Sequence, residues 1–176
     1  MQLLRSDALD KVIHDCRREA FHLELQDEYG TSEGIEPFRN WLEGGRDEDY
    51  GWLRSWLDLV SDMTMHGATM RRARVVTVPH TDYTQWLLEV SRQNIAAGEE
   101  IRYIPRDRVD PNRLTTDDWW LLDDRTVAFT AFEPDGRLGG GAVTNDPRIV
   151  AYCREVRDYV WKAAIPYAEY TAHRTQ

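Results

Sequence analysis

The sequence predicts a single layered α+β domain, with a mixed sheet of five strands and about five helices. Short segments rich in β-branched and aromatic residues alternate with longer segments whose apolar residues recur at helical spacing. The five predicted strands are 21–25, 72–78, 101–104, 126–132 and 137–143. With 176 residues, of which 41% are hydrophobic, the chain is long enough to bury one core. Residues 1–176 are therefore expected to form one globular domain, with helices on one or both faces of the sheet.

The best-specified segment is 71–106, which predicts a strand, a helix and a second strand. Residues 72–78 are mostly β-branched and are followed by proline. Thr81 can cap a helix, and Gly98 suits its end because glycine adopts the left-handed conformation easily. The apolar positions of this helix lie at helical spacing: Tyr83, Trp86, Leu87 and Val90. If the two strands are parallel neighbours, a right-handed crossover is expected.

The first predicted strand has two chemically different sides. Phe21, Leu23 and Leu25 alternate with His22 and Glu24. Since successive side chains of a strand point to opposite faces, the three apolar residues are expected in the core and the other two on a polar side.

The remaining elements follow from capping and breaking residues. Four further helices are predicted, beginning near Ser6, at residue 36, near Asp49 and at Asp146-Pro147. Residues 119–122 are expected to be a short buried strand or a turn. A polar loop is expected at 27–34, a turn at 133–136 and a frayed tail at 171–176.

Composition excludes several classes of protein. The formal net charge of −9, from 22 basic and 31 acidic residues, argues against direct binding of nucleic acid. No apolar run approaches the roughly 18 residues of a membrane span. The charged N-terminal segment does not resemble a signal peptide, so a cytoplasmic protein is expected. Cys16 and Cys153 fit no metal or redox spacing and are expected to be small buried residues.

A candidate ligand site lies on the first two predicted strands. Arg72 and Arg74 share one face, and two guanidinium groups there could bind a phosphate or a carboxylate. If the strands pair, Glu24 could meet either arginine. One alternative is an ordinary salt bridge on the sheet surface. The other is a small polar pocket formed by Glu24, Arg72, Arg74 and Tyr83 and completed by Asp82.

A weaker candidate is a metal site. Asp123, with Glu99 or Glu89, offers the carboxylate oxygens that Mg²⁺ prefers, as a toxin-like nuclease would use. The alternative is an acidic turn, since Asp123 and Asp124 are adjacent and adjacent strand residues point apart. No cofactor is expected.

Known catalytic motifs are missing from the sequence. The central unit followed by LLDDRTVAF resembles the phospholipase-D-like fold, but that chemistry needs His-x-Lys and no histidine here has a lysine two positions later. There is no Gly-x-Ser-x-Gly motif, and glycines 139–141 are not followed by Lys-Ser or Lys-Thr. If the fold is related, its active site is absent.

Three stretches carry a family resemblance. RRARVVTVPHTDYTQWLLEV, with NIAAGEEIRYIPR and DDWWLLDDRTVAF after it, resembles a domain-of-unknown-function family of actinobacterial proteins. Its members are often encoded beside Xre-type helix-turn-helix regulators. Trp86 and Leu87 depart from the Arg-Phe pair of the family pattern. The resemblance implies a regulatory neighbourhood and no particular chemistry.

These observations predict a non-catalytic regulatory or protein-interaction domain. Its expected partner is a helix-turn-helix transcriptional regulator, bound through an acidic, aromatic surface at residues 41–56. Neither nucleic acid nor a membrane is expected to bind directly. The alternative is a small-molecule-binding domain or an enzyme, acting on a phosphorylated or carboxylated ligand at the Arg72–Arg74 site.

Overall fold

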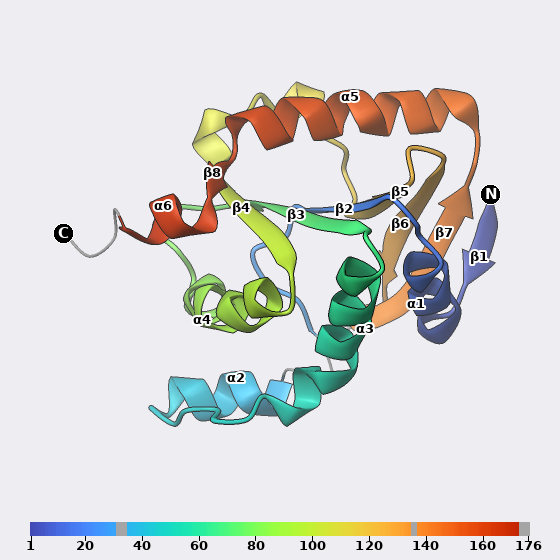
Figure 1. Ribbon diagram of the computed structural model, residues 1–176. Helices are drawn as coiled ribbons and strands as arrows, with labels where there is room; N and C mark the ends of the chain where they lie inside the picture. The colour runs from blue at the N-terminus through green and yellow to red at the C-terminus, as the bar shows by residue number, and fades with distance from the viewer. Residues whose placement is uncertain (31–34, 135–136, 173–176) are drawn as a thin grey trace.

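The computed structural model describes residues 1–30, 35–134 and 137–172, and its centre is one mixed, open β-sheet (Figure 1). The described part of the chain contributes eight strands: β1 (Gln2–Leu4), β2 (Glu19–Glu24), β3 (Thr69–Val76), β4 (Glu99–Pro105), β5 (Trp119–Leu122), β6 (Thr126–Phe132), β7 (Leu138–Thr144) and β8 (Ile165–Pro166). Their order is β1-β7-β6-β5-β2-β3-β4-β8. Strands β2, β3 and β4 are parallel, and the other neighbours are antiparallel.

Helices cover both faces of this sheet. The described α-helices are α1 (Ser6–His14), α2 (Ile35–Leu42), α3 (Arg54–Met65), α4 (Asp82–Ala96), α5 (Pro147–Ala163) and α6 (Tyr167–Ala172). Short 3₁₀ turns are η1 (Gly51–Leu53), η2 (Arg106–Arg108) and η3 (Pro111–Arg113). Helix α5 lies along one face, and α1, α3 and α4 lie on the other, with α2 further out (Figure 1). Among the described helices, none has the length and apolar character to cross a membrane.

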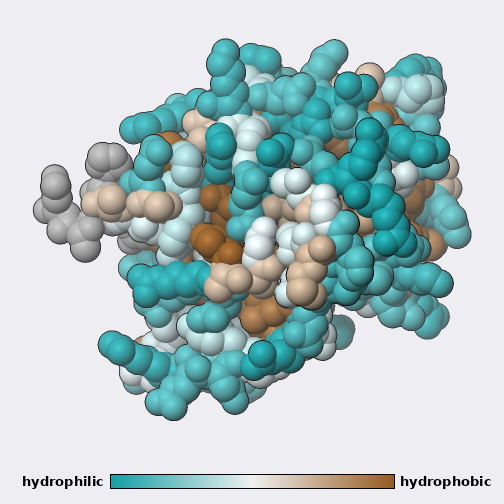
Figure 2. All heavy atoms as spheres, viewed as in Figure 1, coloured by the Kyte–Doolittle hydropathy of each residue, from teal (hydrophilic) through white to brown (hydrophobic). Residues whose placement is uncertain are grey.

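The alternation of strand side chains produces a separate core on each face. Phe21 and Leu23 are fully buried in a cluster that includes Val156 of α5. Ala20, one residue away, belongs to the cluster with Leu9 of α1 and others from α3. The face in Figure 2 is mostly hydrophilic, with apolar residues gathered near its centre.

The central unit confirms the prediction made for residues 71–106. Thr81 caps α4, since its side chain accepts a hydrogen bond from the backbone N–H of Thr84 at 3.1 Å. Gly98 follows the helix with φ +111°, and a Cβ there would lie 2.7 Å from Thr64 Oγ1. Glycine is therefore required at this turn by both its backbone conformation and the close approach of α3.

The prediction of an α+β domain with a mixed sheet is confirmed, but the number of strands is wrong. Eight strands are described, not five. The three additional strands are β1, β8 and β5; the first two have three and two residues, too few for a period to be recognisable. Residues 119–122, expected as a strand or a turn, form β5 at the centre of the sheet.

The alternation predicted for β2 is present, but its polar side is buried. His22 and Glu24 do point away from the α5 core, but they are only 8% and 6% exposed because helices cover that face as well.

Three predicted segments extend beyond the described residues. The loop at 27–34, the turn at 133–136 and the tail at 171–176 extend into 31–34, 135–136 and 173–176, which lie outside the described residues.

Candidate functional site

The candidate site is built around Glu24, which lies between two arginines. In the β2–β3 register, His22 is opposite Arg72 and Glu24 is opposite Arg74. Neighbouring residues of parallel strands point to the same face, so these four side chains meet under α3 and α4. Arg72 Nη1 donates to Glu24 Oε1, and Arg74 Nε donates to Glu24 Oε2. The predicted encounter of Glu24 with the arginines is thus present, and it is buried.

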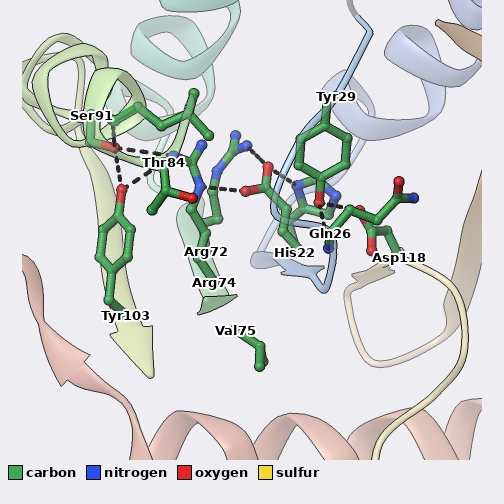
Figure 3. A network of polar contacts seen from close by, with 12 residues as sticks. His22, Gln26, Tyr29, Arg72, Arg74, Val75, Thr84, Ser91, Tyr103 and Asp118 are labelled. Carbon is green, nitrogen blue, oxygen red and sulfur yellow. Dashed lines mark hydrogen bonds and ion pairs between the residues drawn. The ribbon is translucent and has the colours of Figure 1, made fainter. Parts of the chain in front are cut away.

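Both arginines have further partners inside the domain. Arg72 Nε donates to Glu99 Oε1 at 2.6 Å. Arg74 Nη1 donates to Ser91 Oγ at 3.3 Å and to the Tyr103 hydroxyl at 3.2 Å. Figure 3 shows Ser91 and Tyr103 on one side of the arginines and His22 on the other. The two positive charges are therefore matched by two buried carboxylates.

The charges of this network determine its protonation. Burial alone would raise the pKa of Glu24, but the positive charges of Arg72 and Arg74 lower it to about 2. Burial lowers the pKa of His22 to about 3, although the negative charge of Glu24 opposes this. Near neutral pH, Glu24 is therefore ionised and His22 is a neutral imidazole.

A second carboxyl group lies beside the network. Asp118 is 1% exposed. Its Oδ1 accepts from the backbone N–H of Leu25 at 2.8 Å, and its Oδ2 accepts from the Tyr29 hydroxyl at 2.5 Å (Figure 3). Burial raises the pKa of Asp118 to about 6, against the lowering effect of the Tyr29 hydrogen bond. The negative charge of Glu24 acts in the same direction as burial.

Above the network is a cavity of about 510 Å³ between the sheet, α3 and α4. Its lining includes His22, Glu24, Arg72 and Arg74. Most of the remaining lining is apolar, with these aromatic residues: Tyr29, Trp52, Trp56, Tyr83, Trp86, Trp120 and Phe132. The cavity thus combines aromatic walls with a charged but internally neutralised floor.

Several buried polar atoms of the lining residues have no hydrogen-bond partner in the described part of the chain. They are both ring nitrogens of His22, Oδ1 of Asn94 and Oγ1 of Thr130. His22 Nδ1 lies 3.5 Å from Glu24 Oε1 without forming a hydrogen bond. The His22 ring stacks on Trp120, with centroids 4.0 Å apart and an interplanar angle of 11°. Buried polar atoms without a hydrogen-bond partner are uncommon in folded proteins, so these atoms need a physical explanation.

The structure brings together most of the predicted ligand-site residues. Glu24, Arg72, Arg74 and Tyr83 all line the cavity. Asp82 does not, because it is exposed in the first turn of α4. Neither of the two arrangements expected from the sequence is present in full: the salt bridges exist, but they form the floor of a pocket instead of a solvated sheet surface.

The two residues of the predicted metal site lie on opposite faces of the sheet. Glu99 reaches Arg72 on the α4 face. Asp123 lines a second cavity, of about 440 Å³, on the α5 face. Its carboxylate accepts from the backbone N–H groups of Arg17 and Arg18, at 3.1 Å and 2.7 Å. In the described residues, no group of three His, Cys, Asp or Glu could hold a metal ion.

Sequence reasoning missed Asp118, Tyr29, Asn94 and Thr130. Asp118 and Tyr29 come from loops, and a loop partner cannot be inferred without knowing that β5 pairs with β2. Asn94 carried a usable indication. It follows Val90 by four positions and so lies on the buried stripe of α4, where an amide side chain is unusual.

Comparisons with known proteins place the fold and the family. One similar solved structure is that of TrmBL2, an archaeal chromatin protein described as showing a novel mode of DNA binding. The TM-score is 0.50 at 10% sequence identity, which speaks for the fold alone. The match covers 93% of this chain and 52% of that chain, so this chain spans about half the length of that protein.

No curated protein matches the sequence. A family model does match, over residues 7–172, and its description is "Domain of unknown function (DUF6879)". The match extends over nearly the whole chain, including every residue of the network and every lining residue of the cavity except Ser6. The chain therefore belongs to the DUF6879 family.

Proposed function

We propose that this protein is a non-catalytic regulatory domain that binds a small molecule in the cavity between the sheet, α3 and α4. The supporting observation is that the residues lining a cavity of about 510 Å³ include three whose buried polar atoms have no partner among the described residues. Ligand pockets typically have volumes of about 300–1,000 Å³, with apolar walls and a few convergent polar groups. A buried polar atom without a partner costs about 1–3 kcal/mol, and a ligand that supplies the hydrogen bond would recover this free energy.

The protonation of the floor favours binding over catalysis. A general acid or base works best when its pKa is close to the working pH. The pKa values of Glu24 and His22, about 2 and about 3, are far below neutrality. The pKa of Asp118 is closer, at about 6, but both of its oxygens already accept hydrogen bonds. We therefore prefer a binding function to an enzymatic one.

The test is thermal unfolding of the protein with nucleotides, phosphosugars, carboxylates, uncharged heterocycles and metal ions. A ligand of the native state raises the melting temperature. Asn94→Leu removes a cavity acceptor, and Asn40→Leu is the matched control on the exposed surface of α2. A shift that Asn94→Leu abolishes and Asn40→Leu retains supports the proposal. No shift with any compound, or one that is equal in both variants, contradicts it.

A second candidate function is binding to a helix-turn-helix regulator. Helix α2 has no buried residue, and its Ile35 and Leu42 are 40% and 50% exposed. An acidic segment, 43–49, follows it. Two tryptophans of the surface expected at 41–56, Trp52 and Trp56, line the cavity. Helix α2 and the acidic segment 43–49 are therefore the more suitable surface for a protein partner.

Co-purification with helix-turn-helix regulators of the native host tests the second candidate. Leu42→Asp should abolish the association, whereas Asn40→Asp, also exposed on α2, should retain most of it. No association of the unmodified protein would contradict this proposal. The net charge of −9 favours a protein partner over direct contact with nucleic acid.

Three finer points belong with these proposals. Actinobacterial origin, beside Xre-type regulators, would be consistent with a regulatory role. A cytoplasmic location would place the domain where such regulators act. A distant relation to the phospholipase-D-like fold, without its active site, would agree with a binding function. The genes adjacent to the coding sequence test the first point, and fractionation of the native host tests the second.

A further inference from the structure

We infer that the cavity takes an uncharged, planar heterocycle with both hydrogen-bond donors and acceptors, of the kind represented by nucleobases. This inference rests on the proposed small-molecule function and specifies its ligand. It depends on three properties of the cavity. These are the balance of charge at its floor, its aromatic walls, and the presence of both donors and acceptors among the buried polar atoms that lack partners.

The charge balance at the floor disfavours ions of either sign, and the other charged lining residues, Asp10, Asp118 and Arg137, have partners of their own. Glu24 and Glu99 neutralise Arg72 and Arg74 through direct hydrogen bonds. Because Glu24 and Glu99 already offset both positive charges, a phosphate or carboxylate would be desolvated at this floor without a net opposite charge to compensate it. A cation would approach two guanidinium groups at close range. The phosphorylated or carboxylated ligand considered from the sequence is therefore a poor match for this floor.

The walls provide flat apolar surfaces. Trp52 and Trp86 stack, with centroids 5.6 Å apart and an interplanar angle of 23°. Trp56 and Trp120 form a second pair, at 5.7 Å and 59°. All four line the cavity. Aromatic rings stack favourably on planar ligands, and one stacked base contributes about 1–3 kcal/mol in nucleic-acid-binding proteins.

The buried polar atoms that lack partners match a ligand that both donates and accepts hydrogen bonds. A neutral imidazole has one donor and one acceptor nitrogen, and both ring nitrogens of His22 lack partners in the described structure. Asn94 Oδ1 accepts only, and the Thr130 hydroxyl can do either. His22 and Asn94 are 8% and 4% exposed, so water reaches them poorly. Ring N–H and carbonyl groups of a nucleobase-like heterocycle have the matching chemistry.

The experiment is titration calorimetry with adenine, hypoxanthine and uracil, and with benzoate and choline as charged probes. Binding of at least one heterocycle, tighter than either charged probe, is the expected result. Asn94→Leu and Trp56→Leu should each weaken it at least tenfold. Trp41→Leu is the control, because Trp41 packs on Phe38 and does not line the cavity.

The outcomes separate this inference from the proposed function. Binding of benzoate or choline alone, if lost in Asn94→Leu, overturns the inference and leaves the small-molecule function intact. Heterocycle binding that is unchanged in Asn94→Leu and Trp56→Leu places the ligand elsewhere and overturns the inference. If neither these probes nor the wider set of compounds binds, both are contradicted. Trp56 also lies near Arg72, so Trp56→Leu can disturb the buried network as well as the cavity. If that variant does not fold, Asn94→Ala provides a second, milder variant.

Discussion

The central position of Glu24 in the buried network leads to a quantitative prediction for Glu24→Gln. Glutamine has the shape of glutamate without its charge, so two buried guanidinium groups would keep only Glu99 as a charged partner. The pKa of Glu24 falls from 4.5 to about 2 in the folded protein. Each pKa unit corresponds to about 1.4 kcal/mol, so the ionised form contributes about 3 kcal/mol of stability at neutral pH. Removal of one partner of a buried ion pair typically costs a similar amount, about 3–5 kcal/mol.

The assay is urea unfolding at pH 7, followed by tryptophan fluorescence and circular dichroism. A loss of about 3 kcal/mol lowers the melting temperature of a chain of this size by roughly 6–12 °C. Because the folded pKa is depressed, this stability is present above pH 4.5 and is lost as the pH falls toward 2. The difference between the unmodified protein and Glu24→Gln should therefore shrink over that range.

Glu100→Gln is the matched control. Glu100 lies on the other face of the sheet, is 53% exposed and meets Arg71 at 3.4 Å. Exposed ion pairs contribute roughly 0–1 kcal/mol, so this variant should be close to the unmodified protein. If Glu24→Gln is destabilised no more than Glu100→Gln at pH 7, the buried network does not have the energetic role described above.

Three further predictions concern single positions. Asp118→Asn removes a carboxylate whose folded pKa is raised to about 6, so the cost of its ionisation to the folded protein grows as the pH rises. The stability of the variant relative to the unmodified protein should improve by about 2 kcal/mol between pH 4 and pH 7.5, measured by urea unfolding, and an unchanged difference would contradict the assignment. Asp123→Ala should lower the free energy of unfolding by about 2 kcal/mol, since backbone N–H groups lose their acceptor. Millimolar MgCl₂ should not alter the melting temperature of the unmodified protein, and a clear rise with Mg²⁺ would favour the metal hypothesis. Gly98→Ala should cost about 1–3 kcal/mol in chemical unfolding because of its positive φ and the proximity of Thr64, and near-neutral stability would show that the turn can adapt.

The fold could be predicted wherever a local pattern was long enough. The helix after Thr81 and its two flanking strands were found because capping, periodicity and breaking residues agree over 71–106. The edge strands β1 and β8 were missed because two or three residues contain no period. Their existence depends on hydrogen bonds to β7 and β4, which are tertiary features.

The candidate site was predicted in part, for a related reason. Two strands with charged residues at alternate positions indicated that Glu24, Arg72 and Arg74 would meet if those strands paired, and they do pair. Whether that face was solvated or covered depended on the paths of α3 and α4, which the strand pattern does not contain. Asp118 joins the network from the loop before β5, a contact across 93 positions of the sequence.

The most direct measurement is a crystal structure of the protein soaked with the compound that raises its melting temperature most. Small-molecule binding at this cavity predicts density between the sheet, α3 and α4, within hydrogen-bond distance of His22 or Asn94. Density at another surface, with this cavity unchanged, would contradict the account.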